Sequence, residues 1–297
     1  MDLAIIGAGP AGLTSGIYTG RFGLNAVVFD EKIVGGMVNL TPVVENYPGF
    51  EKISGMELIE KMKRQTEKYC EIHEMEKVEK IVVDKEIEIV TTKKIYKSKA
   101  LVFATGTEKR KLDVKGEKEF LGRGVSYCAT CDGMFFRNKK TVVVGGGNAA
   151  AIEALHLKNL GSDVSLIHRR DKLRADKILQ VYVFEKKINV VLDSVVEEIF
   201  GDGIVKGVRI RNVKDNSINE MSIDGVFVSI GEKPNSAIAK SIGVKTDEKG
   251  YIVVDKNQRT NLPKIYAAGD VTGGLRQIVT ACAEGAVAAN SAYEDLL

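Results

Sequence analysis

The chain has little of the cysteine that many small extracellular proteins use to stabilise their folds. Only 4 of its 297 residues are cysteine, which is too few for a disulfide scaffold in a chain of this length. It also lacks a strong net charge, because 43 basic residues nearly balance 40 acidic ones and no long run of either sign occurs. This balance argues against nucleic acid as a partner.

Long apolar runs are missing as well. No segment approaches the roughly 18 consecutive apolar residues that a membrane span needs. The apolar run 3–6 follows Met1 too closely to leave room for a secretion signal. We therefore expect no membrane partner and a cytoplasmic location, where a close cysteine pair is more often catalytic or metal-binding than structural.

The same order of features occurs twice along the chain, and its length suits two domains. Short β-rich runs at 3–6 and 141–144 each lead into glycines and a helix of small residues. A second apolar strand follows each helix, at 25–29 and 163–167. This pattern predicts two βαβ units.

Each copy continues into short alternating strands and then into a buried strand that stops at a glycine. The alternating strands lie at 78–90 and 195–210, and the buried strands at 100–105 and 225–230. The stretch 264–270 indicates one more strand and turn, followed by a helix over 277–296. The second copy is therefore expected to be nested within the first.

The predicted fold class is α/β, with two Rossmann-like nucleotide-binding domains of three layers, each carrying an inserted β-meander. The predicted domains are 1–109 with 235–297, and 110–234, which carries Cys128 and Cys131. Hinges are expected near 108–111 and 233–235.

The first glycine loop, at 7–12, fits the pattern G-x-G-x-x-G between a strand and a helix. Its glycines permit a tight turn, a close approach to a pyrophosphate and close helix packing, and the helix N-terminus attracts phosphates. Asp30 ends the next strand, where a carboxylate binds ribose hydroxyls and repels a 2′-phosphate. The loop thus predicts FAD or NAD rather than NADP, contacted by Gly7, Gly9, Pro10, Ala11, Gly12 and Asp30.

The second glycine loop, at 145–150, has alanine in the third glycine position, which such turns tolerate. Its next strand ends in His168 and a group of arginines instead of a carboxylate. Cations at this place suit a 2′-phosphate through charge-assisted hydrogen bonds. NADPH is therefore predicted here. The candidate residues are Gly145, Gly147, Asn148, Ala149 and Ala150 of the loop, and His168, Arg169, Arg170 and Arg174 after the next strand.

Cys128 and Cys131 form a C-x-x-C pair that Asp132 follows directly. Zinc would need four ligands, yet Cys70 and Cys282 stand alone and the 3 histidines are scattered, so no metal is expected. A buried structural turn is an alternative, but the polar residues of the pair favour a reversible dithiol and disulfide.

Two readings of Asp132 remain open. It either supplies the proton that thiol exchange needs, provided that burial raises its pKa, or caps a helix. Cys70 and Cys282 are expected to be ordinary core residues on helices. The histidines at 73, 156 and 168 give no case for a general base.

Further motifs lie at 45–50 (Glu-Asn-Tyr-Pro-Gly-Phe), 104–106 (Ala-Thr-Gly), 269–270 (Gly-Asp) and 275–277 (Leu-Arg-Gln). With these, nearly the whole chain resembles the low-molecular-weight thioredoxin reductases. The resemblance implies a homodimer in which NADPH reduces FAD and FAD reduces the Cys128–Cys131 disulfide. The dithiol then reduces a thioredoxin-like or glutaredoxin-like protein.

The resemblance also implies residue roles. Cys131 is expected against the flavin, Cys128 attacks the partner disulfide, and Asp132 is the acid. The nested domain is expected to rotate about its hinges. Further FAD contacts are implied at Gly36, Asn46, Thr105, Gly106, Gly269, Asp270, Arg276 and Gln277. Contacts with the NADPH phosphate are implied for Arg169, Arg170 and Arg174.

The sequence departs from the family at two positions. Met37 stands where glutamine is common near the flavin, and Ala149 stands where a small hydroxyl residue is common. Each change removes a possible hydrogen bond to a cofactor, worth roughly 0.5–1.5 kcal/mol. Such losses are too small to abolish nucleotide binding.

Four other functions are alternatives. A dithiol oxidase would not use the arginine cluster, and some relatives use an electron donor other than NADPH. A flavin reductase of the ferredoxin-NADP type leaves Cys128 and Cys131 without a purpose. A redox sensor without turnover would need an output module, and none is evident in the sequence.

Overall fold

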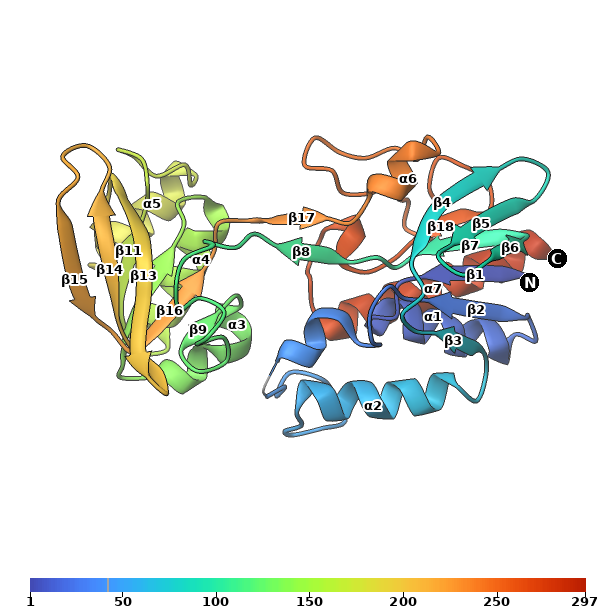
Figure 1. The fold of residues 1–297 in the computed structure, drawn as a ribbon, viewed down its shortest axis with the longest axis horizontal. Coiled ribbons are helices and arrows are strands. Elements are labelled where there is room, and N and C mark those ends of the chain that lie inside the picture. The colour runs from blue at the N-terminus through green and yellow to red at the C-terminus, as the bar shows by residue number, and fades with distance from the viewer. Residues whose placement is uncertain (42) are drawn as a thin grey trace. The chain divides into compact units, whose positions relative to one another are not determined.

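A computed structural model describes residues 1–41 and 43–297. The chain divides into two compact units. Unit 1 comprises Met1–Glu108 and Lys233–Leu297, and unit 2 comprises Lys109–Glu232. In Figure 1 the blue and red ends of the chain belong to the same unit, so unit 2 interrupts unit 1 in the sequence.

Unit 1 is built on a parallel sheet of five strands in the order β18-β7-β1-β2-β3. The central strands are buried along their whole length, as expected for a parallel sheet with both faces covered. The strands are β1 (Leu3–Ile6), β2 (Ala26–Phe29), β3 (Glu71–His73), β7 (Ala100–Phe103) and β18 (Ile265–Ala267).

Alternate residues of these strands face two separate cores. One face packs against the helices α1 (Pro10–Arg21), α2 (Gly55–Thr66) and α7 (Ile278–Leu296). The other packs against the antiparallel meander β4 (Val78–Val83), β5 (Ile87–Thr91) and β6 (Ile95–Ser98), and the short helix α6 (Ala237–Ser241). The short helices η1 (Gly36–Leu40) and η3 (Asp270–Thr272) complete the unit.

Unit 2 repeats this plan with a parallel sheet in the order β12-β11-β10-β16-β9. Helices pack on one face and a second meander packs on the other. The strands are β9 (Val125–Ser126), β10 (Lys140–Val144), β11 (Asp163–Ile167), β12 (Asn189–Val191) and β16 (Gly225–Val228). The helices are α3 (Ala129–Asp132), η2 (Gly133–Phe136), α4 (Asn148–Asn159) and α5 (Lys177–Glu185), and the meander is β13 (Ser194–Asp202), β14 (Ile204–Asn212) and β15 (Ile218–Ser222).

The chain passes between the units through two short strands, β8 (Thr107–Lys109) and β17 (Glu232–Pro234), which pair with each other. Within unit 2 the Arg110 N–H donates to the carbonyl of Gly231 at 3.1 Å. The two ends of unit 2 therefore lie side by side.

The structure departs from the sequence expectations in three places. Each meander gains a third strand, β6 or β15, that the sequence pattern did not indicate. The buried strands β7 and β16 end at Phe103 and Val228, before the glycine turns that follow them. Cys70 is not on a helix, because α2 ends at Thr66, whose carbonyl accepts the N–H groups of both Tyr69 and Cys70 in a closing turn.

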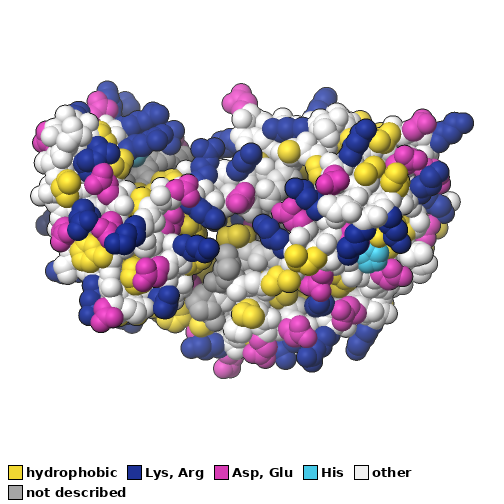
Figure 2. All heavy atoms as spheres, in the orientation of Figure 1, with side chains coloured by type: hydrophobic (Ala, Val, Ile, Leu, Met, Phe, Trp, Pro, Cys, Tyr) yellow, Lys and Arg dark blue, Asp and Glu magenta, His cyan; other side chains and the backbone are white. Residues whose placement is uncertain are grey.

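The surface mixes charges of both signs, and Figure 2 shows basic and acidic side chains interspersed over the visible face. Among the residues that the structure describes, no helix combines the length and the apolar character needed to cross a bilayer.

Candidate functional site

The loop between β1 and α1 contains two kinds of glycine: those where a side chain would clash with the backbone, and one where a side chain would meet open space. Gly7 has a φ of +104°, and a side chain there would lie 2.2 Å from the carbonyl oxygen of Ala104. A side chain at Gly12 would lie 1.8 Å from the carbonyl oxygen of Gly7. A side chain at Gly9 meets no protein atom within 4 Å, and no side chain caps the N-terminus of α1. The loop therefore leaves open space and unsatisfied N–H groups where a phosphate would bind.

Asp30 is held at this loop by two backbone hydrogen bonds. Its Oδ2 accepts the N–H of Ala8 and its Oδ1 accepts that of Lys32, each at 2.8 Å. Burial raises the pKa of the Asp30 carboxyl, although both hydrogen bonds act in the opposite direction. The carboxylate is thereby fixed beside the glycine loop, with further lone pairs left for ribose hydroxyls.

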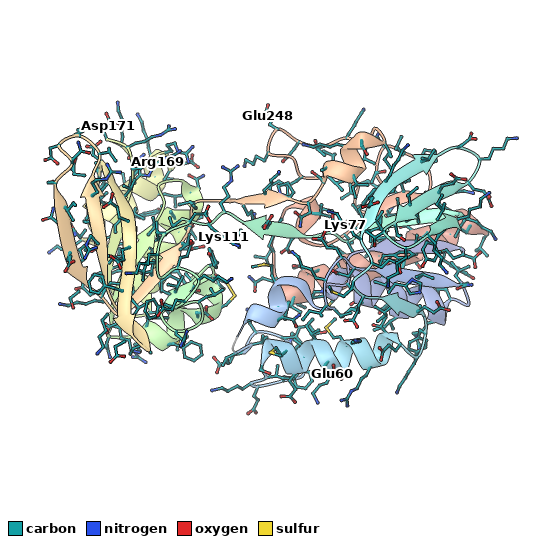
Figure 3. All side chains as sticks on the ribbon, in the orientation of Figure 1. Glu60, Lys77, Lys111, Arg169, Asp171 and Glu248 are labelled. Atoms are coloured by element: carbon teal, nitrogen blue, oxygen red, sulfur yellow. A yellow bond between two sulfur atoms is a disulfide. The ribbon has the colours of Figure 1, made fainter. Side chains whose placement is uncertain are left out.

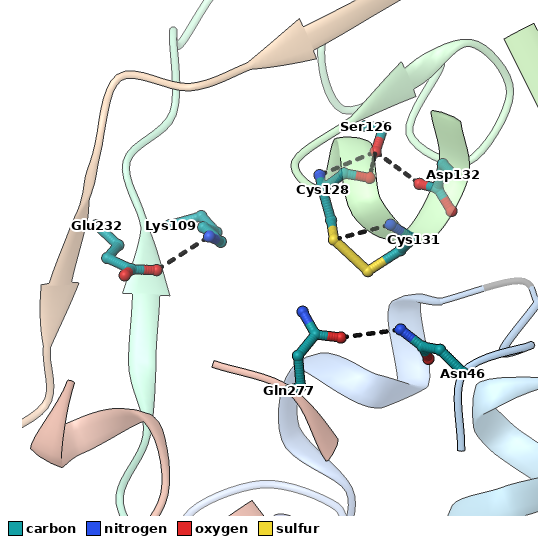
Figure 4. Close-up of a disulfide and its surroundings, with 8 residues drawn as sticks. All are labelled: Asn46, Lys109, Ser126, Cys128, Cys131, Asp132, Glu232 and Gln277. Carbon is teal, nitrogen blue, oxygen red and sulfur yellow. Dashed lines mark hydrogen bonds and ion pairs between the residues drawn. A yellow bond between two sulfur atoms is a disulfide. The ribbon is translucent and has the colours of Figure 1, made fainter. Parts of the chain in front are cut away.

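Other predicted FAD residues follow the carboxyl ends of the same parallel strands, where ligands of open α/β sheets bind. Thr105 and Gly106 follow β7, and Gly269 and Asp270 follow β18. The Asn46 amide donates to Oε1 of Gln277 at 3.0 Å (Figure 4). All fourteen predicted FAD contacts lie in unit 1: Gly7, Gly9, Pro10, Ala11, Gly12, Asp30, Gly36, Asn46, Thr105, Gly106, Gly269, Asp270, Arg276 and Gln277.

Sequence reasoning missed Glu284, a carboxylate on α7. Its Oε2 accepts the N–H of Gly269 at 2.7 Å and the hydroxyl of Thr272 at 3.2 Å. Burial raises the pKa of Glu284. Its sequence signal is that it is a charged residue within the run of small residues 281–286. Glu284 fixes the turn that carries Asp270.

The second glycine loop, between β10 and α4, repeats the arrangement of the first. A side chain at Gly145 would lie 2.2 Å from the carbonyl oxygen of Ser229, whereas one at Gly147 meets nothing within 4 Å. Gly147 is the N-cap of α4 and no side chain caps that helix. The Asn148 side chain instead exchanges two hydrogen bonds with Asp176.

The His168 side chain packs against this loop and is shielded from solvent. It is 5% exposed, and a side chain at Gly146 would lie 2.1 Å from its Nδ1. Burial and the nearby cations Arg174, Arg170 and Arg169 lower the pKa of His168, which favours the neutral imidazole. Its buried environment suits a packing role under the loop better than contact with a phosphate.

The three arginines are exposed around the end of β11. Figure 3 shows Arg169 and Asp171 on the loop that follows this strand. The Arg174 N–H donates to the carbonyl of Gly146 at 2.6 Å, which ties the cluster to the glycine loop. In the part of the chain that the structure describes, no salt bridge involves Arg169, Arg170 or Arg174. Their guanidinium groups are available for a phosphate.

Cys128 and Cys131 form a disulfide whose Cα atoms are 5.3 Å apart (Figure 4). Cys128 is the N-cap of α3, and its Sγ accepts the N–H of Cys131 at 3.2 Å. Both residues are partly exposed. The pair is thus a formed disulfide at the start of a short helix in unit 2 and has access to solvent.

Asp132 is not a helix cap, because its side chain makes no capping hydrogen bond. Its Oδ2 accepts the hydroxyl of Ser126 at 2.6 Å, while Oδ1 is buried without a hydrogen-bond partner among the described residues. Burial raises the pKa of the Asp132 carboxyl, and the Ser126 hydrogen bond partly opposes this. This environment suits an acid that keeps its proton above the ordinary range of aspartate.

The other two cysteines are free, half-buried thiols in unit 1. Burial raises the pKa of Cys70 to about 12 and also raises that of Cys282, whose Sγ lies 3.9 Å from the hydroxyl of Tyr47. Such thiols are poor nucleophiles. Within residues 1–41 and 43–297, no group of three or more His, Cys, Asp or Glu side chains is placed to hold a metal ion.

Two glycine loops shaped for pyrophosphates and an accessible disulfide beside a buried acid define a disulfide oxidoreductase that binds two nucleotides. The chain belongs to the pyridine nucleotide-disulphide oxidoreductase family, whose model matches residues 1–285.

Within that family the chain is similar to thioredoxin reductases. It is 45% identical over 297 residues to the thioredoxin reductase of Listeria innocua, covering 99% of this chain and 93% of that protein. It is 42% identical over 294 residues to that of Bacillus subtilis, covering 98% and 93%. The structure of thioredoxin reductase from Streptococcus pyogenes matches with a TM-score of 0.93 and 42% identity, covering 99% of this chain and 97% of that one.

Proposed function

We propose that this chain is a thioredoxin-disulfide reductase that uses FAD and NADPH to reduce its Cys128–Cys131 disulfide. The dithiol passes the electrons to a disulfide of a thioredoxin-like protein. The observation that carries the proposal is the accessible disulfide directly before the buried carboxyl of Asp132. The same unit also carries a glycine loop and three exposed arginines.

The residues of each loop fit the cofactor proposed for it. In unit 1 the open space at Gly9 and the fixed carboxylate of Asp30 suit the pyrophosphate and ribose of FAD. In unit 2 the open space at Gly147 and the arginine cluster suit the pyrophosphate and 2′-phosphate of NADPH. When bound, the two cofactors supply the electron pair that opens the disulfide.

The chain's own residues then complete the exchange. Cys128 is proposed as the nucleophile toward the partner and Cys131 as the residue that faces the flavin. Asp132 holds the proton that the departing thiolate needs. Since nicotinamide and the cysteine pair cannot occupy one flavin face together, unit 2 is proposed to rotate about the strands β8 and β17.

A thioredoxin-like partner needs an apolar surface near the reactive sulfur. Met134 and Phe135 lie three and four residues after Cys131 and are 56% and 41% exposed. Their position suits docking of the protein whose disulfide is reduced. A cytoplasmic homodimer is proposed as the working form of the enzyme, which size-exclusion chromatography with light scattering will test.

The electron donor is tested by anaerobic titration of the purified protein with NADPH. We expect the oxidised flavin spectrum to bleach with about one equivalent of NADPH per reduced centre. A spectrum that stays oxidised would rule out NADPH as the donor. Peroxide formation with small dithiols, without reduction of thioredoxin, would favour the dithiol oxidase instead.

The cysteine pair is tested by Cys128→Ser. We expect thioredoxin reduction to fall to background while NADPH still bleaches the flavin, because only the step toward the partner is lost. Cys70→Ser is the matched control, since that thiol is half-buried and unreactive. Full activity of Cys128→Ser would contradict the proposal and favour a flavin reductase that does not use the pair.

A further inference from the structure

Ser126 is a buried hydroxyl residue to which the proposed chemistry has given no role. It is the last residue of β9 and only 4% exposed. Its Oγ lies 2.6 Å from Oδ2 of Asp132 and 3.0 Å from the backbone nitrogen of Cys128, as Figure 4 shows. One side chain therefore links the carboxyl group to the residue that carries the nucleophilic sulfur.

The directions of these hydrogen bonds follow from counting hydrogens. The Cys128 nitrogen can only donate, so Ser126 Oγ accepts its hydrogen. The single hydroxyl hydrogen of Ser126 is then left for one of two acceptors. Oδ2 of Asp132 at 2.6 Å is a much better acceptor than the carbonyl of Cys128 at 3.4 Å. Ser126 therefore donates to Oδ2.

This arrangement decides which oxygen of Asp132 carries the proton. Because Oδ2 accepts from Ser126, the neutral carboxyl group holds its proton on Oδ1. Oδ1 is buried and has no other partner among the described residues. It is therefore the oxygen that remains available to exchange a proton with a sulfur.

We propose that Ser126 is a positioning residue that presents Oδ1 of Asp132, with its proton, to the sulfur chemistry of the Cys128–Cys131 pair. The proposal rests on the function proposed above, and it adds a residue that sets the pH range of the reaction. The hydrogen bond from Ser126 also stabilises the ionised carboxylate, so it lowers the pKa that burial raises and lowers the pH at which the acid is lost.

The proton moves as follows. The Cys128 thiolate attacks one sulfur of the partner disulfide, and the departing partner thiolate takes the proton from Oδ1 of Asp132. The Cys131 thiol then returns a proton to Asp132 and attacks Cys128. That attack forms the Cys128–Cys131 disulfide and releases the second partner thiolate, which water protonates. Two electrons pass to the partner and Asp132 ends as it began.

The test is the pH dependence of a single turnover. The full holoenzyme is reduced, freed of excess reductant and mixed with oxidised thioredoxin that contains tryptophan. Because this chain has no tryptophan, the fluorescence change reports the partner alone. We expect the rate to rise with pH as Cys128 ionises and to fall as Asp132 loses its proton.

Replacing Ser126 by alanine should raise the pKa of Asp132, because the ionised carboxylate loses a hydrogen bond. The falling limb of the pH–rate profile should therefore move to higher pH. At the pH where the wild-type limb has fallen to half, Ser126→Ala should keep well over half of its own plateau rate. Ser126→Thr keeps the hydroxyl and should restore the wild-type limb. Ser194→Ala is the matched control, because Ser194 is also a buried serine of unit 2 but its hydroxyl donates to the carbonyl of Leu192, away from the cysteine pair.

A falling limb that stays in place in Ser126→Ala overturns the proposal. If thioredoxin is not the substrate, the proposed function is wrong, but the role of Ser126 can still be tested by a separate measurement. The infrared carbonyl band of protonated Asp132, identified by its loss in Asp132→Asn, is titrated in the oxidised protein. This titration must also move to higher pH in Ser126→Ala, and an unmoved titration again overturns the role of Ser126.

Discussion

At the scale of single residues, the glycines of the two loops fall into two groups. Gly12 and Gly145 are required by the fold, because a side chain at either would overlap backbone at 1.8 Å and 2.2 Å. Gly9 and Gly147 are not required in this way, because a side chain at either meets no protein atom within 4 Å. At these two positions the open space lies at the N-cap of a helix, where a phosphate can enter it.

Gly9→Ala separates these two requirements. We expect the free energy of unfolding of the flavin-free protein to change by less than ~1 kcal/mol, because alanine tolerates the extended backbone there. The affinity for FAD should fall by about tenfold or more, equivalent to ~1.4 kcal/mol. Urea unfolding and flavin fluorescence titration measure the two effects.

Gly12→Ala is the matched comparison for that experiment. It should destabilise the flavin-free protein by roughly 1–3 kcal/mol, because its side chain overlaps the carbonyl of Gly7. Unchanged FAD affinity in Gly9→Ala would show that the pyrophosphate does not approach this loop.

The arginine cluster gives a second prediction at this scale. Arg170→Ala should raise the KM for NADPH by roughly tenfold, because a charge-assisted hydrogen bond contributes about 1.5–3 kcal/mol. The KM for NADH, which has no 2′-phosphate, should stay the same and serves as the internal control. Steady-state kinetics with both nucleotides measure this, and an equal change for both would contradict a 2′-phosphate site.

At the scale of elements, a buried carboxylate ties the meander of unit 1 to its parallel sheet. Glu76 precedes β4 and is 2% exposed. Its Oε1 accepts the hydroxyls of Thr91 at 2.6 Å and Tyr96 at 2.9 Å, which come from β5 and β6. Its N–H donates to the carbonyl of Asp30 at 2.8 Å. Three strands of the meander thus converge beside the proposed ribose-binding residue.

Glu76 should make stability depend on pH in acid. Burial by itself would raise the pKa of Glu76, but hydrogen bonds from Thr91, Tyr96 and Lys93 more than offset it and the pKa is lowered. A carboxyl with a lowered pKa stabilises the folded state above its unfolded pKa. That contribution is lost as the pH falls from the unfolded pKa through the folded one.

Glu76→Gln tests this linkage. The variant should lose roughly 2 kcal/mol of unfolding free energy at neutral pH, and its stability should fall less than that of the wild type on acidification below about pH 5. Urea unfolding across pH measures both. Glu79→Gln, at an exposed position in β4, is the control. Parallel stability curves for wild type and Glu76→Gln would contradict the expectation.

At the scale of the whole molecule, unit 2 has the features of an independent domain. It is one continuous stretch, Lys109–Glu232, and its ends meet through the Arg110 and Gly231 backbone. It also has its own hydrophobic cores on both faces of its sheet. Nothing in these features requires unit 1 for folding.

A polypeptide of residues 109–232 should therefore unfold cooperatively in urea and bind NADPH but not FAD. Retention on immobilised 2′,5′-ADP measures nucleotide binding. Arg170→Ala in the same polypeptide is the control for specific retention. An unfolded polypeptide, seen by circular dichroism, would show that unit 2 depends on unit 1. A folded one that retains FAD would overturn the assignment of cofactors to units.

The boundaries of the compact units lie within two residues of the hinges expected from the sequence. Both βαβ units and both meanders were likewise visible in the pattern of apolar residues and glycines. The third strands β6 and β15 were missed, because their short, exposed residues carry no clear alternation. The helical position expected for Cys70 was wrong, since a turn after Thr66 ends the helix there.

The sequence by itself determined the features that depend on neighbours along the chain: two glycine loops, the acid and the arginines that follow the next strands, and the Cys128 and Cys131 pair. Only the tertiary structure decided how Ser126, Glu76 and Glu284 act. Each of them works through partners that other elements bring near. The side-chain contacts of Glu76 and Glu284 span 12 or more residues and form only when strands and helices pack. Ser126 lies two and six residues from its partners, but it contacts them because the chain turns from β9 into α3.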